Sequence, residues 1–204
     1  MNNYEDQKHG HNTYVTLGAS NHSEDIRSSN DFYATPPVAV QHLLEIESFN
    51  KNIWEPGCGM NHIVEILEQA GYNVKRSDIV QMVEDDKFEQ IDFLTTTGTW
   101  DGDIVTNPPF KLATEFVIKA LDLVKPGAKV AMFLKLQFLE GTKRYSALFE
   151  DNPPKRIWVS THRYGCTKDG YFNEKGNAPS AICYCWFIWE KGFKGDPIVK
   201  WINY

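Results

Sequence analysis

The sequence has few of the features that mark membrane-spanning or secreted proteins. It contains no apolar run of about eighteen residues, so we expect no transmembrane helix. Its N-terminus is polar and has no apolar core of a signal peptide. Its four cysteines do not form the pattern of a disulfide framework and fit a reducing compartment. These absences predict a cytoplasmic protein.

Positive charge is also scarce, because the formal net charge of the 204 residues is −6. An acidic chain has no broad electrostatic attraction to nucleic acid, although a local basic surface is compatible with this charge. The hydrophobic content of 42% is typical of a globular protein. Residues 1–30 carry few apolar side chains, and we interpret them as a flexible polar leader. We predict that residues 31–204 form a single domain.

Strand-like and helix-like segments alternate along most of this domain. The last two strand-like segments are the exception, because no helical pattern separates them. This order predicts an α/β fold with a mostly parallel sheet of seven strands, an antiparallel C-terminal strand and helices on both faces. The predicted strands cover residues 52–54, 73–78, 91–94, 103–106, 129–134, 156–160 and 181–189.

One short motif, Asn107-Pro108-Pro109-Phe110, lies where a predicted strand ends and a helical pattern begins. In open α/β sheets, ligands bind at the carboxyl ends of the strands. The two prolines donate no backbone hydrogen bonds, so the carbonyls of this turn can accept bonds from a ligand. The Asn107 amide adds an acceptor oxygen, and the Phe110 ring adds a flat face. The motif therefore predicts a site for a planar group that carries an exocyclic NH₂.

A second candidate site lies upstream, where a strand enters the glycine-containing turn Glu55-Pro56-Gly57-Cys58-Gly59. Glycine allows the backbone to approach a ligand closely. Asp78 ends the next predicted strand about twenty residues later, where a carboxylate can accept hydrogen bonds from ribose hydroxyls. A strand-end Asp that merely starts a turn is the alternative interpretation. Asp92 is open to two interpretations as well, as an acceptor for an adenine amine or as the cap of the Thr-rich turn that follows.

These segments, in this order, resemble the class I S-adenosylmethionine (SAM) dependent methyltransferases, whose fold is Rossmann-like. Asn-Pro-Pro-Phe resembles the motif of adenine-N6 DNA methyltransferases, and the compact organisation is similar to small phage-type enzymes. The resemblance covers roughly residues 31–190. It implies methyl transfer from SAM to the N6 amine of adenine in DNA, most simply double-stranded DNA, in a bacterial or phage-infected cell. S-adenosylhomocysteine would be the product.

The resemblance also implies roles for individual residues. Residues 32–36 correspond to the segment that contacts the methionine end of SAM. Asn107 and the Pro108 carbonyl would hold the target amine, and Phe110 would stack on the target base. The residues implied in SAM binding are Tyr33, Thr35, Pro36, Glu55, Pro56, Gly57, Cys58, Gly59, Asp78, Asp92 and Asn107. The residues implied in catalysis are Asn107, Pro108, Pro109 and Phe110.

Two departures from the family pattern stand out. Asn61 occupies the last glycine position of the SAM-binding turn, and asparagine tolerates a left-handed backbone better than most residues. No separate target-recognition domain is visible. Nucleic-acid contact would then depend on residues 141–180, which carry seven Lys or Arg against four Asp or Glu. This segment includes a long loop, 162–180, that we expect on the ligand face of the sheet. The predicted contacts are Lys143, Arg144, Arg163, Lys168, Tyr171 and Lys175.

Several alternatives stay open at this point. A solvated loop surface is the other interpretation of the basic segment. The acceptor could be an RNA base or a protein glutamine, although glutamine methyltransferases usually carry a helical N-terminal domain that residues 1–30 cannot supply. A catalytically inactive SAM- or DNA-binding module is a further alternative, for which Asn61 is the clue. We predict no metal site, because the zinc-type side chains include a Cys-x-Cys within an apolar strand. Those side chains are His162, Cys166, Cys183 and Cys185.

Overall fold

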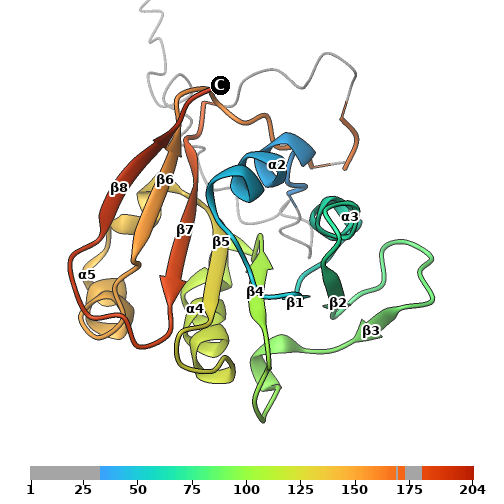
Figure 1. Cartoon of the computed structure of the whole chain (residues 1–204), viewed down its shortest axis with the longest axis horizontal. Helices are drawn as coiled ribbons and strands as arrows, with labels where there is room; N and C mark the ends of the chain where they lie inside the picture. The colour runs from blue at the N-terminus through green and yellow to red at the C-terminus, as the bar shows by residue number, and fades with distance from the viewer. Residues whose placement is uncertain (1–32, 169, 173–180) are drawn as a thin grey trace, which may run out of the picture.

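A computed structural model of the chain describes residues 33–168, 170–172 and 181–204. The predicted leader, residues 1–30, therefore lies outside the described residues. The strands are β1 (Asn52–Glu55), β2 (Asn73–Asp78), β3 (Phe88–Gln90), β4 (Asp103–Thr106), β5 (Lys129–Lys135), β6 (Arg156–Ser160), β7 (Tyr184–Glu190) and β8 (Ile198–Ile202). They form one sheet in the order β3-β2-β1-β4-β5-β7-β6-β8 (Figure 1).

The pairing of the strands confirms the predicted fold class. The pairs from β3 across to β5 are all parallel, and β7 runs antiparallel to both β5 and β6. The sheet has eight strands where seven were predicted, because β8 adds to β6 in a parallel pair. Four of the five β8 residues are exposed, so this strand depends on backbone pairing and carries little of the apolar pattern by which buried strands are recognised.

Helices lie on both faces of the sheet, as predicted (Figure 1). The longer ones are α2 (Pro37–Ile46), α3 (His62–Gln69) and α4 (Ala113–Leu123). The short α5 (Thr142–Arg144) continues into a π-helical turn, Tyr145–Phe149, and short 3-10 helices cover 93–95, 110–112 and 136–139. No helix in the described part of the chain is long and apolar enough to cross a membrane.

Alternate residues of the central strands feed two separate cores. Val130, Met132 and Leu134 of β5 pack with α4 on one face. Ala131 and Phe133 of the same strand pack with α2 and α3 on the other. Because successive side chains of a strand point to opposite faces, the near-continuous apolar sequence of β5 fits a strand that is covered on both sides.

The predicted strand at residues 91–94 is wrong. Here β3 lies upstream at 88–90, and residues 93–95 form a 3-10 helix. The Asp92 side chain caps this helix by accepting a bond from the Leu94 backbone N–H at 3.0 Å. Phe93 is buried, with its ring 5.3 Å from that of Trp54 and 5.0 Å from that of Phe116. The apolar residues that suggested a strand therefore anchor a turn to the core.

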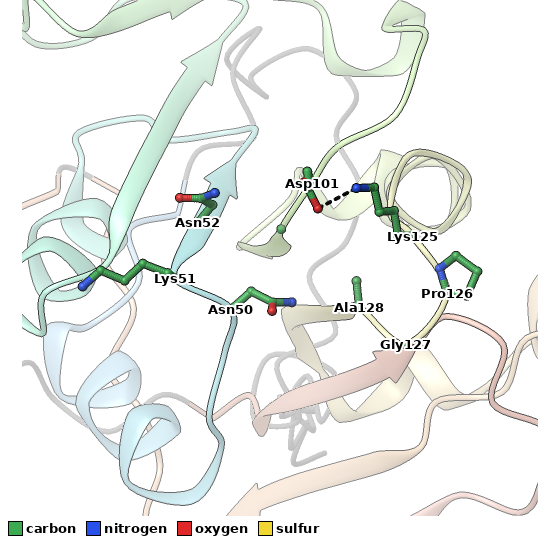
Figure 2. A pocket seen from close by; sticks show the side chains of 9 residues that line it. Asn50, Lys51, Asn52, Asp101, Lys125, Pro126, Gly127 and Ala128 are labelled. Atoms are coloured by element: carbon green, nitrogen blue, oxygen red, sulfur yellow. Dashed lines mark ion pairs between the residues drawn. The ribbon is translucent and has the colours of Figure 1, made fainter.

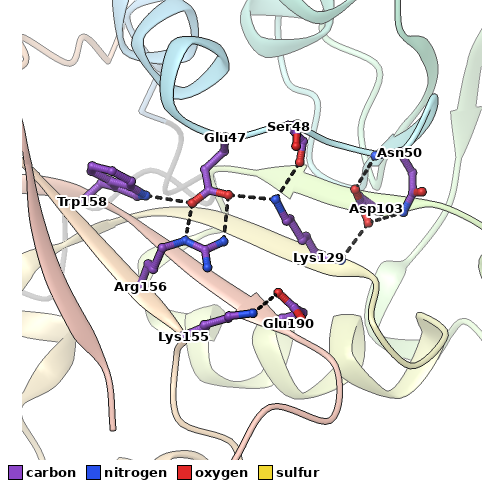
Figure 3. A network of polar contacts seen from close by, with 9 residues as sticks. All are labelled: Glu47, Ser48, Asn50, Asp103, Lys129, Lys155, Arg156, Trp158 and Glu190. Atoms are coloured by element: carbon purple, nitrogen blue, oxygen red, sulfur yellow. Dashed lines mark hydrogen bonds and ion pairs between the residues drawn. The ribbon is translucent and has the colours of Figure 1, made fainter. Parts of the chain in front are cut away.

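The amino-terminal edge of the sheet is held by a buried acidic side chain (Figure 3). Glu47, at the end of α2, accepts bonds from Lys129 at 2.9 Å, from Trp158 at 2.9 Å and from two nitrogens of Arg156. Burial alone would raise the pKa of Glu47, but the bonds from Arg156, Lys129 and Trp158 outweigh it and hold the pKa at about 2. The network ties α2 to the first residues of β5 and β6.

A second carboxylate completes this edge (Figure 3). Asp103, the first residue of β4, accepts bonds from the Asn50 backbone and side chain at 2.6 and 2.7 Å. It also accepts a bond from the Lys129 backbone N–H at 2.7 Å. These bonds connect the segment that enters β1 with the starts of β4 and β5. At the amino edge, both of these carboxylates are therefore satisfied by internal donors.

Candidate functional site

The two predicted sites meet at one edge of the sheet. The strand order reverses between β1 and β4, since β2 and β3 extend the sheet on one side and β5 on the other. Ligands of open α/β sheets bind outside the carboxyl ends of the strands at this reversal. Glu55 is the last residue of β1 and Thr106 is the last residue of β4. The glycine turn and the Asn107–Phe110 turn therefore leave neighbouring strands at the same edge.

Buried polar atoms without partners concentrate at this edge. Among the described residues, four buried side-chain atoms make no hydrogen bond, namely Glu55 Oε2, Asn61 Oδ1, Arg76 Nε and Thr106 Oγ1. All four belong to the carboxyl-terminal half of β1, β2 or β4, or to the turn that follows β1. An unsatisfied buried polar atom costs about 1–3 kcal/mol. These four atoms are hydrogen-bonding groups that a polar ligand at this edge can satisfy.

Glu55 is the most strongly perturbed of these groups. Its side chain is fully buried, and the Val64 backbone N–H bonds its carboxyl group. Burial, and then the negative charge of Asp78, raise the pKa of Glu55 well above its usual range. The Oε2 side of the carboxyl keeps hydrogen-bonding capacity that no described protein group uses.

Asp78 fastens the glycine turn to the end of β2. Its Oδ2 accepts a bond from the Gly59 backbone N–H at 3.0 Å, and its Oδ1 accepts one from the Ile79 N–H at 2.7 Å. Each carboxylate oxygen keeps a further lone pair. A Cβ on Gly57 would lie 3.4 Å from Thr106 Oγ1, so the turn passes close to the end of β4. The turn can hold a ligand against both strand ends because it carries no side chain there.

Asn61 keeps the turn in shape without a glycine. Its φ of 66° is left-handed, and it is the only described non-glycine residue with a positive φ. The Asn61 side chain donates a bond to Asp85 at 2.7 Å, and Arg76 donates one to the same carboxyl oxygen at 2.8 Å. The departure from the family pattern therefore preserves the backbone conformation and adds an anchor to the segment after β2.

The Asn107 side chain is oriented by a backbone carbonyl from the start of the described chain. Its Nδ2 donates a bond to the Tyr33 carbonyl at 2.6 Å. Because the nitrogen of the amide is used in this way, the oxygen is the end that remains for a ligand N–H. Residues 32–36 and the Asn107 turn were predicted at one site, and the described part of that segment contacts the turn through this bond. Phe32 lies outside the described residues.

The Phe110 ring lies in an aromatic group. Its centre is 5.4 Å from that of Tyr33 and 5.9 Å from that of Tyr184. The Lys135 ammonium lies over the ring at 4.1 Å, a cation–π distance. Lys135 ends β5 and Tyr184 begins β7. Sequence spacing did not identify either residue, because both join this group only through strand pairing.

The described part of the loop between β6 and β7 lies against residues 33–36 and the glycine turn, at the edge where it was predicted. The Ala34 N–H donates a bond to the Thr167 carbonyl at 2.8 Å. His62 Nε2 lies 2.8 Å from the Gly170 carbonyl oxygen. A Cβ on Gly170 would lie only 2.1 Å from Met60 Sδ, so the loop packs closely on the glycine turn. Met60 and His62 were not singled out from the sequence, since their partners lie more than a hundred positions away.

Several predicted SAM-binding residues have structural roles in the fold. Asp92 caps the 3-10 helix that follows it, which matches the alternative interpretation made from the sequence. Cys58 is buried in the turn, and burial raises the pKa of its thiol. Thr35 and Pro36 are also buried, between the Tyr33 carbonyl and α2. These residues shape the walls of the edge.

Arg144, a predicted nucleic-acid contact, binds its own chain. Its guanidinium donates bonds to the carbonyls of Phe138, at 2.8 Å, and Glu140. Its Nε donates to Thr114 Oγ1 at 3.2 Å, and the group lies 4.3 Å from the centre of the Phe138 ring. Burial lowers the pKa of Arg144. This side chain connects the segment after β5 to the first turn of α4.

The other predicted nucleic-acid contacts have varied surroundings. Lys143 is exposed, and Tyr171 is 73% exposed. Arg163 donates a hydrogen bond to the Ala181 carbonyl, shortly before β7, at 2.6 Å. The Lys168 ammonium lies 5.4 Å from the centre of the Tyr33 ring. Lys175 lies outside the described residues.

The cysteines do not form a metal centre in the part of the chain that the structure describes, where no group of three or more His, Cys, Asp or Glu could hold a metal ion. The Sγ atoms of Cys183 and Cys185 are 4.0 Å apart. Burial raises the pKa of Cys166 to about 12, which opposes the thiolate form that metals require.

A separate hollow of about 540 Å³ opens at the opposite edge of the sheet (Figure 2). It is bordered by the starts of β1, β4 and β5, where Lys125 pairs with Asp101 at 2.8 Å. None of the buried unpartnered atoms among the described residues belongs to it. The hollow therefore lacks the unmet hydrogen-bonding groups that distinguish the carboxyl edge. Its lining residues are Asn50, Lys51, Asn52, Asp101, Gly102, Lys125, Pro126, Gly127 and Ala128.

Comparison with known proteins identifies the fold. No protein-family model matches the sequence, and no curated protein sequence does. A protein from Listeria monocytogenes described as a class I SAM-dependent methyltransferase matches with a TM-score of 0.56 and 13% identity, over 83% of this chain and 65% of that one. The M protein of the type I restriction enzyme EcoKI matches with a TM-score of 0.56 and 13% identity, over 86% of this chain and 49% of that one.

TrmN from Thermus thermophilus also matches, with a TM-score of 0.50 and 18% identity, over 80% of this chain and 50% of that one. The chain thus spans between about half and two thirds of the length of these structures. The likeness, together with the strand order, shows that the chain has the Rossmann-like fold of class I SAM-dependent methyltransferases.

Proposed function

We propose that this protein transfers a methyl group from SAM to an exocyclic amine of a nucleobase, and specifically to N6 of adenine in DNA. The observation that supports it most directly is the orientation of Asn107, whose Nδ2 is bound to the Tyr33 carbonyl. This bond leaves the Asn107 amide oxygen as an acceptor in the same turn as the Pro108 carbonyl and the Phe110 ring. Two acceptors next to a flat ring suit a planar group with an NH₂.

The residues of the carboxyl edge fit SAM. Glu55 offers a buried oxygen without a partner, Gly57 leaves the backbone accessible, and Asp78 has lone pairs for ribose hydroxyls. Ile79 follows Asp78 with its side chain 59% exposed, which provides an apolar surface for an adenine ring. SAM would supply a methyl group made electrophilic by its sulfonium.

The acceptor half of the site acts on the amine. The lone pair of an adenine amine is delocalised into the ring, so the amine is a poor nucleophile. Asn107 Oδ1 and the Pro108 carbonyl would each accept a hydrogen bond from one N–H of the amine. These bonds would make the nitrogen more tetrahedral and point its lone pair at the methyl group. The gain lies in positioning and in stabilising the positive charge that develops on nitrogen. The extra proton then leaves to solvent, and no side chain with a shifted pKa is needed to remove it.

A paired adenine must leave the duplex to reach this turn, and an aromatic side chain can replace the stacking that it loses. Phe110 would provide that surface. The Lys135 ammonium lies 4.1 Å from the Phe110 ring, so a positive charge accompanies this aromatic surface. The likeness to the M protein of a restriction enzyme further supports DNA as the acceptor.

The test is methyl transfer from tritiated SAM to duplex DNA, tRNA, rRNA and a release-factor protein in separate reactions. We expect label in DNA, and sequencing of the product should locate modified adenines. Label only in an RNA or only in the protein would assign the site to another acceptor. Label in none, with SAM still bound in calorimetry, would indicate a binding module.

Asn107→Ala separates the two halves of the site. Removing a preorganised acceptor should lower the transfer rate by about 10²–10³-fold. SAM affinity measured by calorimetry should change little. An equal loss of transfer and SAM binding would contradict the division of roles proposed for the two turns.

A further inference from the structure

The segment that follows β5 runs beside the proposed acceptor turn. Because β4 and β5 are parallel neighbours, with Thr106 paired to Met132, their carboxyl ends lie at the same edge. Lys135 ends β5 and lies over the Phe110 ring, and Arg144 bonds Thr114 at the start of α4. Residues 136–145 are thereby attached at both ends to the element that carries the Asn107–Phe110 turn.

Arg144 gives this segment a defined shape. Its bonds to the carbonyls of Phe138 and Glu140 close the turn between them, and Phe138 is itself buried among the aromatic rings of the core. The guanidinium is therefore committed to internal acceptors. The residues on either side of these anchors are consequently held with their side chains in solvent.

Three large apolar side chains are exposed on this segment and on the neighbouring 3-10 turn. Leu112 is 41%, Leu139 40% and Tyr145 56% exposed. Single exposed apolar residues are common on protein surfaces. These three, however, occur on the two segments that border the proposed base site, and exposed Lys111 and Lys143 accompany them. Apolar side chains flanked by lysines match a nucleic acid, whose bases are apolar on their faces and whose backbone is anionic.

We propose that Lys111, Leu112, Leu139, Lys143 and Tyr145 form a wedge surface that contacts double-stranded DNA around the target base. This inference rests on the proposed function. Leu139 and Tyr145 would insert at the step from which the base is extruded and replace its stacking. Lys111 and Lys143 would contact the adjacent phosphates. The wedge surface would thus provide, from within this domain, DNA contacts of the kind that a separate target-recognition domain would otherwise make.

The test compares duplex with single-stranded DNA. A single strand needs no wedge, because its bases are already unpaired. Leu139→Ala and Tyr145→Ala should each lower kcat/KM for a duplex by about tenfold and change it less than about twofold for the matching single strand. Trp201→Ala is the control, since Trp201 is 65% exposed on the edge strand β8. It should affect neither substrate. SAM binding by calorimetry confirms that each variant is folded.

The lysines are tested through salt dependence. Lys111→Ala and Lys143→Ala should each reduce the slope of log K against log salt for duplex binding by about one, whereas Lys194→Ala, an exposed lysine near the start of β8, should leave it unchanged. Binding is followed by the fluorescence anisotropy of a labelled random-sequence duplex.

The outcomes distinguish this inference from the proposed function. Transfer to DNA by the wild type, with wedge variants indistinguishable from it on duplex, would overturn the wedge surface and keep the activity. No transfer by the wild type, with weaker duplex binding by the lysine variants, would keep the surface and overturn the activity. Equal losses on duplex and single strand would also overturn the wedge, because they would show a role unrelated to base extrusion.

Discussion

The two edges of the sheet use the same kinds of polar side chain to opposite ends. At the amino edge, Glu47 and Asp103 accept bonds from several internal donors (Figure 3). At the carboxyl edge, Glu55 and Thr106 are just as buried, yet each has an atom with no partner. Burial is therefore equal at the two edges, and hydrogen-bond satisfaction separates them.

This difference teaches where the stability of the fold resides. A satisfied buried network contributes to stability or at least costs little, whereas unsatisfied atoms subtract from it until a ligand binds. Substitutions at the amino edge should therefore act on folding, and substitutions at the carboxyl edge should act on ligand binding. Six substitutions, at Glu47, Gly102, Gly57 and Glu55 and two at Asn61, test this contrast.

The largest effect on stability is expected for Glu47→Gln at the amino edge. The substitution leaves the partly buried positive charges of Lys129 and Arg156 without a counter-charge, which should lower the free energy of unfolding by about 3 kcal/mol in urea titrations at pH 7. The transfer rate per folded molecule should not change. Glu190→Gln, in a half-buried pair with Lys155, is the control and should cost less than about 1 kcal/mol.

The Glu47 effect should depend on pH in a defined direction. The folded pKa of about 2 lies below the ordinary value of 4.5, so the stabilisation is complete above pH 4.5 and is lost as the pH falls towards 2. The difference between wild type and Glu47→Gln should shrink over that window. A difference that stays constant down to pH 2 would show that the charge of Glu47 is not its source.

A pair of glycines gives the next comparison. A Cβ on Gly102, just before β4, would lie 2.3 Å from the Asn52 carbonyl oxygen, so Gly102→Ala should lower the free energy of unfolding by about 1–3 kcal/mol. A Cβ on Gly57 meets nothing closer than 3.4 Å. Gly57→Ala should therefore fold nearly as well as wild type but bind SAM about tenfold more weakly, because the added methyl lies against Thr106 Oγ1, an unpartnered atom of the carboxyl edge. Urea titration measures the stability of both variants, and calorimetry measures their SAM affinity. A larger stability loss for Gly57→Ala than for Gly102→Ala would contradict the prediction.

Most substitutions of buried residues lower the free energy of unfolding, but Glu55→Gln should raise it relative to wild type at higher pH. The folded pKa of Glu55 lies above the ordinary 4.5, so ionisation destabilises the fold, and the free energy of unfolding falls as the pH rises above 4.5. The Gln side chain does not ionise, so the variant does not lose stability in this way. Its stability relative to wild type should grow with pH, while its SAM affinity should fall by about tenfold, roughly the value of one hydrogen bond.

The smallest effect is expected at Asn61. Asn61→Ala places an ordinary side chain at a φ of 66°, which should cost about 1–2 kcal/mol. Asn61→Gly loses the bond to Asp85 but relieves the backbone, so its thermal midpoint should stay close to that of wild type. A larger loss for glycine than for alanine would show that the Asp85 bond, and not the backbone conformation, explains the residue.

Most of the fold could be predicted because burial leaves a local pattern. β2 and β6 begin and end at the predicted residues, and β5 is one residue longer than predicted. Each of these strands is a run of strand-forming residues bounded by residues typical of turns. The strand predicted at 91–94 failed because Phe93 is buried by tertiary contacts with Trp54 and Phe116, which no local period reveals. β8 was missed for the converse reason, since it pairs with β6 but leaves four of its five residues exposed.

The sequence by itself determined the fold class and the two turns, because the motifs at 55–59 and 107–110 are contiguous and their backbone restrictions are local. Only the tertiary structure decided how individual side chains are used. It joined Asn107 to Tyr33 and His62 to Gly170, and it directed the Arg144 guanidinium inwards. Such partners are brought together by strand order and loop packing, so their pairing is a property of the folded chain and leaves no mark in the spacing of the residues.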